Sequence, residues 1–192
     1  MFKKLICRSI TTMAIIATSS INAMAQDLCA YTKRSGMPNI DTPAGPYGTA
    51  TMGYTNIALC GRFSCPPYRL YQNNGVVNAS ATKNAAGYSI RYNRSFMSQV
   101  LNAFGERATA GIIAHELGHI IDFALRPGNV PQAEREATAD RYAGCAFALA
   151  GAPVQNILPL AQTLNALGES PGYPTVEQRA QLLLIGYNQC SQ

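Results

Sequence analysis

The only two histidines of this 192-residue chain lie four positions apart, in the sequence HELGH at residues 115–119. On a helix, residues i and i+4 project from the same face one turn apart, so His115 and His119 can bind one ion together. Glu116 would then lie beside a water molecule on that ion, where a carboxylate can act as a general base. In an ordinary core, the two rings would instead need partners for four nitrogens. The pattern therefore predicts a metal centre, with Zn²⁺ as the ion.

A catalytic zinc ion takes three protein ligands and keeps a fourth position for water. Because the chain has no third histidine, a carboxylate or thiolate must supply the third ligand. Glu136 and Asp140 share one face of the next predicted helix, and small residues between them would let that helix pack closely. We expect Glu136 to bind zinc and Asp140 to accept a hydrogen bond from a ligand imidazole. Glu134 is the rival ligand, and a third reading is that these acids only decorate a helix N-terminus.

The surrounding sequence predicts an α+β fold, with a small antiparallel sheet packed on a mainly helical domain over residues 68–192. Asn- and Gly-rich turns separate the β-prone segments, which favours a meander. The period beyond them is helical, and the helix that carries HELGH is apolar nearly all round, so it should be central. We expect strands at 68–72, 76–82 and 88–93, and helices at 95–104, 107–125, 132–150, 159–167 and 175–188.

The first residues have the pattern of an export signal. Residues 1–25 begin with basic residues, continue with a short apolar stretch and end in Ala-Met-Ala, which predicts cleavage near Ala25 and Gln26. The alternative is an uncleaved anchor. Cleavage would remove three of the fifteen basic residues and no acidic one, so the net charge of +5 would fall to +2. With no run of Lys or Arg left, we expect no nucleic-acid partner, and no later segment has membrane-spanning length.

Cysteine usage also indicates export to the periplasm or the medium, where disulfides persist. Residues 26–67 show no sustained period and predict an irregular segment pinned by a disulfide. As hypotheses, Cys60 pairs with Cys65, and Cys145 pairs with Cys190 near the carboxyl terminus. Five cysteines follow the predicted signal, so one thiol stays unpaired: Cys29, Cys60, Cys65, Cys145 and Cys190.

HExxH followed by Glu-x-x-Ala-Asp, here residues 136–140, resembles the gluzincin zinc metallopeptidases. The similarity is greatest to the HtpX-like and prenyl-protease group and to the putative neutral zinc metallopeptidases. Two flanking segments extend it over roughly residues 70–185. The sequence NASA at 78–81 resembles the Asn-Ala-x-Ala strand of that group, and GYPT at 172–175 with Arg179 resembles its His-Pro-Ser…Arg element.

The resemblance implies a zincin-like domain that binds zinc and hydrolyses peptide bonds in proteins or peptides. Tyr173 stands where many relatives have histidine, so we expect Tyr173, or failing that Arg179, to donate to the oxyanion of the transition state. The alternatives are that Tyr173 is only a turn aromatic and that Arg179 is only a surface or helix-packing residue. An extended substrate would pair with the strand at 88–92, unless that edge is covered. The other function left open is an exported zinc-binding or protein-interaction factor with little or no proteolytic activity.

Overall fold

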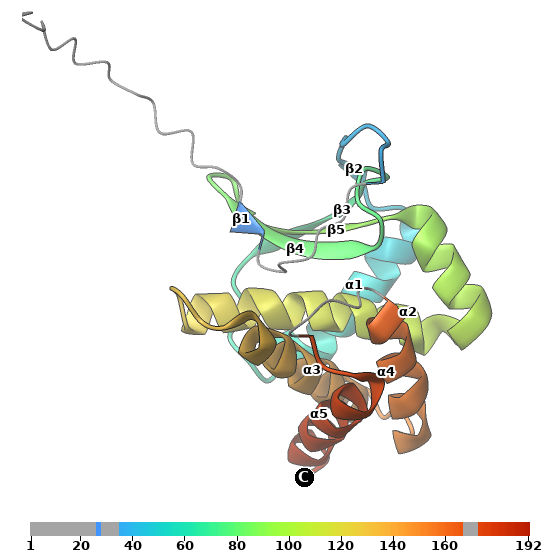
Figure 1. Ribbon diagram of the computed structural model, residues 1–192, viewed down its shortest axis with the longest axis vertical. Helices are drawn as coiled ribbons and strands as arrows, with labels where there is room; N and C mark the ends of the chain where they lie inside the picture. The colour runs from blue at the N-terminus through green and yellow to red at the C-terminus, as the bar shows by residue number, and fades with distance from the viewer. Residues whose placement is uncertain (1–25, 28–34, 167–172) are drawn as a thin grey trace, which may run out of the picture.

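A computed structural model describes residues 26–27, 35–166 and 173–192 of the chain. The predicted signal at 1–25 lies outside the described residues. A small sheet lies on one side of the central helix α2 (Arg94–Leu125), and the carboxyl-terminal helices lie on the other (Figure 1). This arrangement confirms the expected α+β fold.

The sheet is mixed, so the expectation of an antiparallel meander is wrong for one of its strands. The strand order is β1-β4-β5-β3-β2, and β3 runs parallel to β5. Residues 73–78 carry the chain from β3 past β5, so that β4 pairs on the far side of β5. Strand β5 is consequently central and cannot be the free edge expected at 88–92. The strands are β1 (Gln26–Asp27), β2 (Thr42–Pro43), β3 (Tyr68–Gln72), β4 (Ala79–Asn84) and β5 (Gly87–Tyr92).

Of the five α-helices among the described residues, four lie close to their predicted ranges. The first segment of α2 is separated from the second at Gly105, whose φ of 83° lies in the left-handed region that favours glycine. This kink agrees with the predicted break between two helices. The Asn93 side chain caps the first segment by accepting a hydrogen bond from the Phe96 N–H. The other helices are α1 (Pro46–Cys60), α3 (Gln132–Leu149), α4 (Ile157–Ala166) and α5 (Val176–Cys190).

Helix α1 lies inside the segment that the sequence predicts to be irregular, so that expectation is wrong for residues 46–60. Its two glycines, three threonines and one asparagine are weak helix formers. Pro46 in the first turn is the one local helix signal. Two buried threonines on α1 hydrogen-bond to backbone carbonyls one turn earlier, Thr51 to Tyr47 at 2.9 Å and Thr55 to Thr51 at 2.9 Å. The intrinsic helix propensity of this segment is low, so packing against α2, α3 and β3 stabilises the helix.

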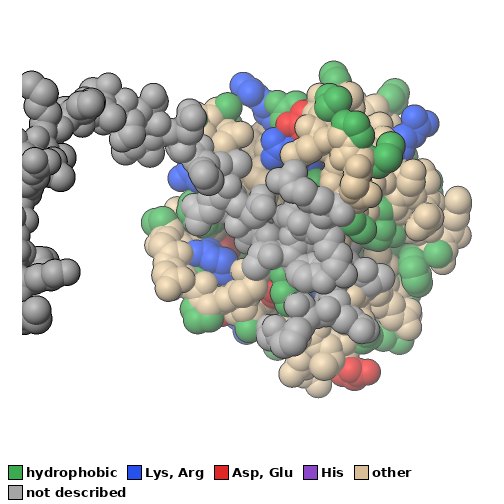
Figure 2. Space-filling view, turned by 45° about the horizontal axis from the view of Figure 1, so that its top comes forward, with side chains coloured by type: hydrophobic (Ala, Val, Ile, Leu, Met, Phe, Trp, Pro, Cys, Tyr) green, Lys and Arg blue, Asp and Glu red, His purple; other side chains and the backbone are tan. Residues whose placement is uncertain are grey.

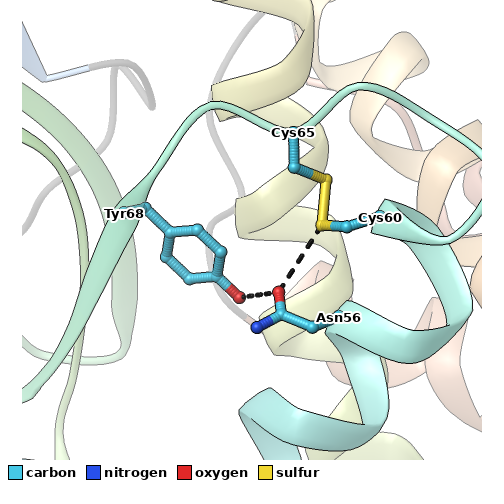
Figure 3. The surroundings of a disulfide bond; sticks show 4 residues. All are labelled: Asn56, Cys60, Cys65 and Tyr68. Atoms are coloured by element: carbon cyan, nitrogen blue, oxygen red, sulfur yellow. Dashed lines mark hydrogen bonds between the residues drawn. A yellow bond between two sulfur atoms is a disulfide. The ribbon is translucent and has the colours of Figure 1, made fainter.

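The two hypothetical disulfides are both present. Cys60–Cys65 joins the end of α1 to the segment before β3, beside a hydrogen bond from the Tyr68 hydroxyl to the Asn56 side-chain oxygen (Figure 3). Burial raises the pKa of Tyr68, which keeps this donor protonated. The second disulfide joins Cys145 on α3 to Cys190 at the end of α5. The first bond therefore ties α1 to the segment before β3, and the second ties α5 to α3.

Thiol counting tests these pairings. A chain that begins at residue 26 is expected to show one reactive thiol after denaturation, because four of its five cysteines are in disulfides. Titration with a thiol reagent, before and after reduction, should give one and five. A count of five before reduction would contradict both disulfides.

Among the described residues, no helix combines the length and the apolar character needed to cross a bilayer. The Lys and Arg side chains on the face drawn in Figure 2 are dispersed and do not gather into one patch.

Candidate metal centre

Residues 108–123, in the second segment of α2, form the longest unbroken run of buried residues in the part of the chain that the structure describes. This segment lies between the sheet on one side and α3 and α4 on the other, as its apolar sequence predicts. His115, Glu116 and His119 each have an exposed fraction of 1%. Ionisable side chains buried so completely need charged or hydrogen-bonding partners, and the facing helix α3 supplies them.

Three side chains that can bind a metal ion converge between α2 and α3. Nε2 of His115 lies 3.1 Å from Nε2 of His119. Nε2 of His115 is 3.3 Å from Oε2 of Glu136, and Nε2 of His119 is 3.4 Å from Oε1 of the same carboxylate. Atoms bonded to a tetrahedral zinc ion at about 2.0–2.1 Å lie about 3.3 Å from one another. The donor spacing and the donor types therefore fit a zinc ion. Glu136 completes the cluster expected from the sequence, and its exposed fraction is 1%.

Close packing of the two helices lets Glu136 reach the histidines. A Cβ atom on Gly118 would lie 2.9 Å from the Cα of Ala139, so α2 and α3 meet where both residues are small. The rival ligand Glu134 is not part of this cluster. Its side chain is half-exposed and forms an ion pair with Arg126. Gln132, which the sequence alone does not single out, donates from Nε2 to Oε1 of Glu136 at 2.7 Å.

A buried ion pair fixes the connection between α2 and α3. Arg135 donates to Oδ2 of Asp122 at 2.7 Å and to the backbone oxygens of Arg126 and Gly128 at 3.2 and 2.8 Å. Because Arg135 directly precedes Glu136, this contact also holds the start of α3 beside the histidines. Neither Asp122 nor Arg135 belongs to a recognisable motif, so only the three-dimensional structure identifies their role.

Asp140 lies behind His115, as the sequence predicts. Its Oδ1 is 2.9 Å from Nδ1 of His115, the ring nitrogen that faces away from the ligand cluster. Burial lowers the pKa of His115, but the hydrogen bonds and charges of Asp140 and Glu136 outweigh burial and raise it to about 10. Burial raises the pKa of Glu136, but the two histidines hold it well below its usual value. In the metal-free protein, a cation must therefore displace a proton from His115 to bind there.

Glu116 lies beside this cluster and under β4. Burial and the charge of Glu136 raise its pKa, while the histidines and a hydrogen bond from the Ala81 backbone lower it, and the net shift is upward. Oε2 of Glu116 has no hydrogen-bond partner among the described residues. A carboxylate with a raised pKa and a free oxygen can accept a proton and give it back.

Tyr173 and Arg179 both lie on the side of the cluster that α5 covers. Arg179 is 1% exposed, and its guanidinium donates to Oδ1 of Asp140 at 2.8 Å and to Oε2 of Glu136 at 3.4 Å. The guanidinium carbon is 6.0 Å from the centroid of the Tyr173 ring. The structure thus brings Arg179 onto the carboxylates of the site and brings Tyr173 to Arg179.

No family model matches this chain. Among curated proteins and among solved structures, no match was found either. The resemblance to the gluzincins rests on the quoted motifs alone.

Replacing Asp140 by alanine is expected to weaken zinc binding by about 10- to 100-fold, because His115 loses the acceptor that orients its ring. Competition with a chromophoric chelator measures this affinity. Asp41→Ala, at an aspartate that pairs with Arg91 beside β2, is a control outside the cluster. If Asp140→Ala binds zinc as tightly as the unaltered protein, Asp140 has only a structural role.

Proposed function

We propose that this chain is an exported zinc-dependent endopeptidase. The observation that supports the proposal is the buried convergence of His115, His119 and Glu136, with Glu116 beside them. A site that only held zinc for stability would need ligands but no general base. Glu116 makes no ion pair that would explain its burial among the described residues, so we assign it a chemical role.

His115, His119 and Glu136 would hold the ion. When bound, zinc would act as a Lewis acid, polarising a peptide carbonyl and lowering the pKa of a water molecule. The raised pKa of Glu116 suits it to take a proton from the attacking water and deliver it to the amine that leaves. Asp140 would hold the His115 ring in the orientation that directs Nε2 towards the ion.

An extended substrate would add to β4 at Ala79 and Ala81, because β1 pairs with β4 at Thr82 and Lys83. One residue beyond the β4–β5 ladder, the Asn93 N–H donates to the Asn78 oxygen. Hydrogen-bonded positions alternate along an antiparallel pair. The backbone N–H and C=O groups of Ala79 and Ala81 therefore point away from β5. Ala81 donates its N–H to Glu116, so this edge runs directly beside the general base. Main-chain pairing there would accept many peptide sequences.

Tyr173 is the proposed donor to the developing oxyanion. Its contact with Arg179 brings its ring to the α5 side of the cluster, and a phenolic hydroxyl can donate to an oxyanion. The alternative, an aromatic residue that only packs in the turn before α5, predicts that Tyr173→Phe keeps full activity.

Export is proposed from the signal-like sequence at 1–25, with cleavage near Ala25 and Gln26 into the periplasm or the medium. The two disulfides and the absence of a membrane-spanning helix among the described residues are compatible with an extracellular protein.

Casein cleavage by protein of known zinc content tests the proposal. We expect hydrolysis that stops when a chelator strips the ion and returns when zinc is restored. A protein that binds zinc at this site and cleaves neither casein nor a panel of unstructured proteins would be the alternative, a zinc-binding or interaction factor with little or no proteolytic activity.

A further inference from the structure

We infer that Arg179 is a positioning residue that sets the zinc affinity of the site by holding Glu136 and Asp140 in place. This inference rests on the proposed metal site, and it differs from the role that the sequence suggests for Arg179. It predicts that the amino-terminal half of α5, far along the chain from HELGH, determines how tightly the ion binds.

One guanidinium bridges two carboxylates that lie one turn apart on α3. Arg179 donates to Asp140 at 2.8 Å and to Glu136 at 3.4 Å, and Asp140 in turn lies 2.9 Å from the His115 ring. Arg179 therefore acts on the ligand Glu136 directly and on the ligand His115 through Asp140. The planar, forked guanidinium suits this double contact, which the single ammonium group of a lysine cannot reproduce.

Charge balance is a second reason to assign this positioning role to Arg179. The buried cluster contains three carboxylates, Glu116, Glu136 and Asp140, and each is at most 1% exposed. A divalent cation and the Arg179 guanidinium together offset three negative charges. Without Arg179, two carboxylates would lose a buried partner, and unpaired buried charge is strongly destabilising.

Helix α5 holds Arg179 in a fixed register against α3. A capping box at Thr175 and Gln178 begins the helix directly before Arg179. Further along, Cβ atoms on Gly144 and Gly186 would lie 1.9 Å from backbone oxygens of the opposite helix, so the two backbones are in direct contact. The Cys145–Cys190 disulfide closes the far end of the same pair of helices.

These contacts argue against Arg179 as a donor to the substrate. Its side chain is 2% exposed, and both of its terminal nitrogens already donate to carboxylates of the site. A donor to an oxyanion must point at the position where that charge develops. The guanidinium instead points at the residues that hold the ion.

The test compares the zinc affinity of folded Arg179→Met, Arg179→Lys and Arg141→Met proteins by chelator competition. Arg141 is an exposed arginine on α3 and serves as the matched control. We expect affinity to fall about 10- to 100-fold in Arg179→Met, as it does when partners of metal ligands are lost. The lysine variant should fall by about tenfold because it keeps the charge without the double contact, and Arg141→Met should not change. Circular dichroism of the metal-free proteins checks folding.

A double-mutant cycle with Asp140→Ala shows whether Arg179 acts through Asp140. If it does, the loss caused by Arg179→Met is smaller in the Asp140→Ala background than in the unaltered protein. Hydrolysis at saturating zinc separates positioning from direct catalysis. A positioning residue gives variants whose activity largely recovers once the site is filled.

Unchanged zinc affinity in folded Arg179→Met would overturn the inference, as would unchanged affinity in Arg179→Lys if the methionine variant does not fold. Unchanged affinity together with a persistent loss of hydrolysis at saturating zinc would show a direct catalytic role instead. These affinities are measured without substrate. If the wild type binds zinc but cleaves nothing, the endopeptidase proposal fails and the role of Arg179 is still decided.

Discussion

Replacing Glu116 by glutamine is expected to lower the rate of peptide hydrolysis by about 10²- to 10⁴-fold and to leave one zinc ion bound per chain. Glutamine keeps the size of the side chain but cannot accept the proton of the attacking water. Because Glu116 is not one of the three clustered ligands, its loss should leave zinc binding intact. The measurement is casein cleavage and zinc content in the same preparation.

Glu106→Gln is the matched control, since Glu106 is an exposed glutamate on the same helix. It should cleave casein as the unaltered protein does. If Glu116→Gln kept full activity with its zinc, Glu116 would not be the general base and the proposed chemistry would need another proton acceptor. If instead it lost its zinc, the residue would belong to the ion-binding set.

Glu136→Ala is expected to remove most of the bound zinc, with affinity falling on the order of 100-fold or more, beyond the loss seen for partners of ligands. Without Glu136, only the two imidazoles remain, and a zinc site of this kind needs three protein ligands. Equilibrium dialysis against a fixed concentration of free zinc measures the stoichiometry, with circular dichroism as the check on folding.

Glu134→Ala provides the comparison, because Glu134 lies on the same helix two residues earlier and pairs with Arg126 at the surface. Its zinc content should not change. Undiminished zinc in Glu136→Ala would show that another group holds the ion, and loss of zinc in Glu134→Ala would identify that group.

The parts of the site that follow from local periodicity could be predicted from the sequence. The spacing of His115 and His119 requires only that residues 107–125 form a helix, and the apolar character of that stretch predicts its central position. Glu136 could be preferred over Glu134 because its face also carries Asp140 and small residues. Gly118 and Ala139 meet as that preference requires.

Other features depend on contacts between distant segments and have no local signal. The burial of Arg179 between Asp140 and Glu136 depends on how α5 packs on α3, and Gln132 reaches Glu136 only because α3 begins where it does. Helix α1 forms from weak helix formers because tertiary packing outweighs propensity. The parallel pairing of β3 with β5 depends on a connection that passes a neighbouring strand, which the β-prone segments do not encode.

X-ray diffraction from crystals of the zinc-loaded protein, with data on both sides of the zinc absorption edge, tests the central claim most directly. We predict one anomalous peak, from a zinc ion that is bonded to Nε2 of His115, Nε2 of His119 and a carboxylate oxygen of Glu136. A structure in which the Glu136 carboxylate lies far from both imidazoles, or in which zinc binds elsewhere and leaves this cluster empty, would contradict the account.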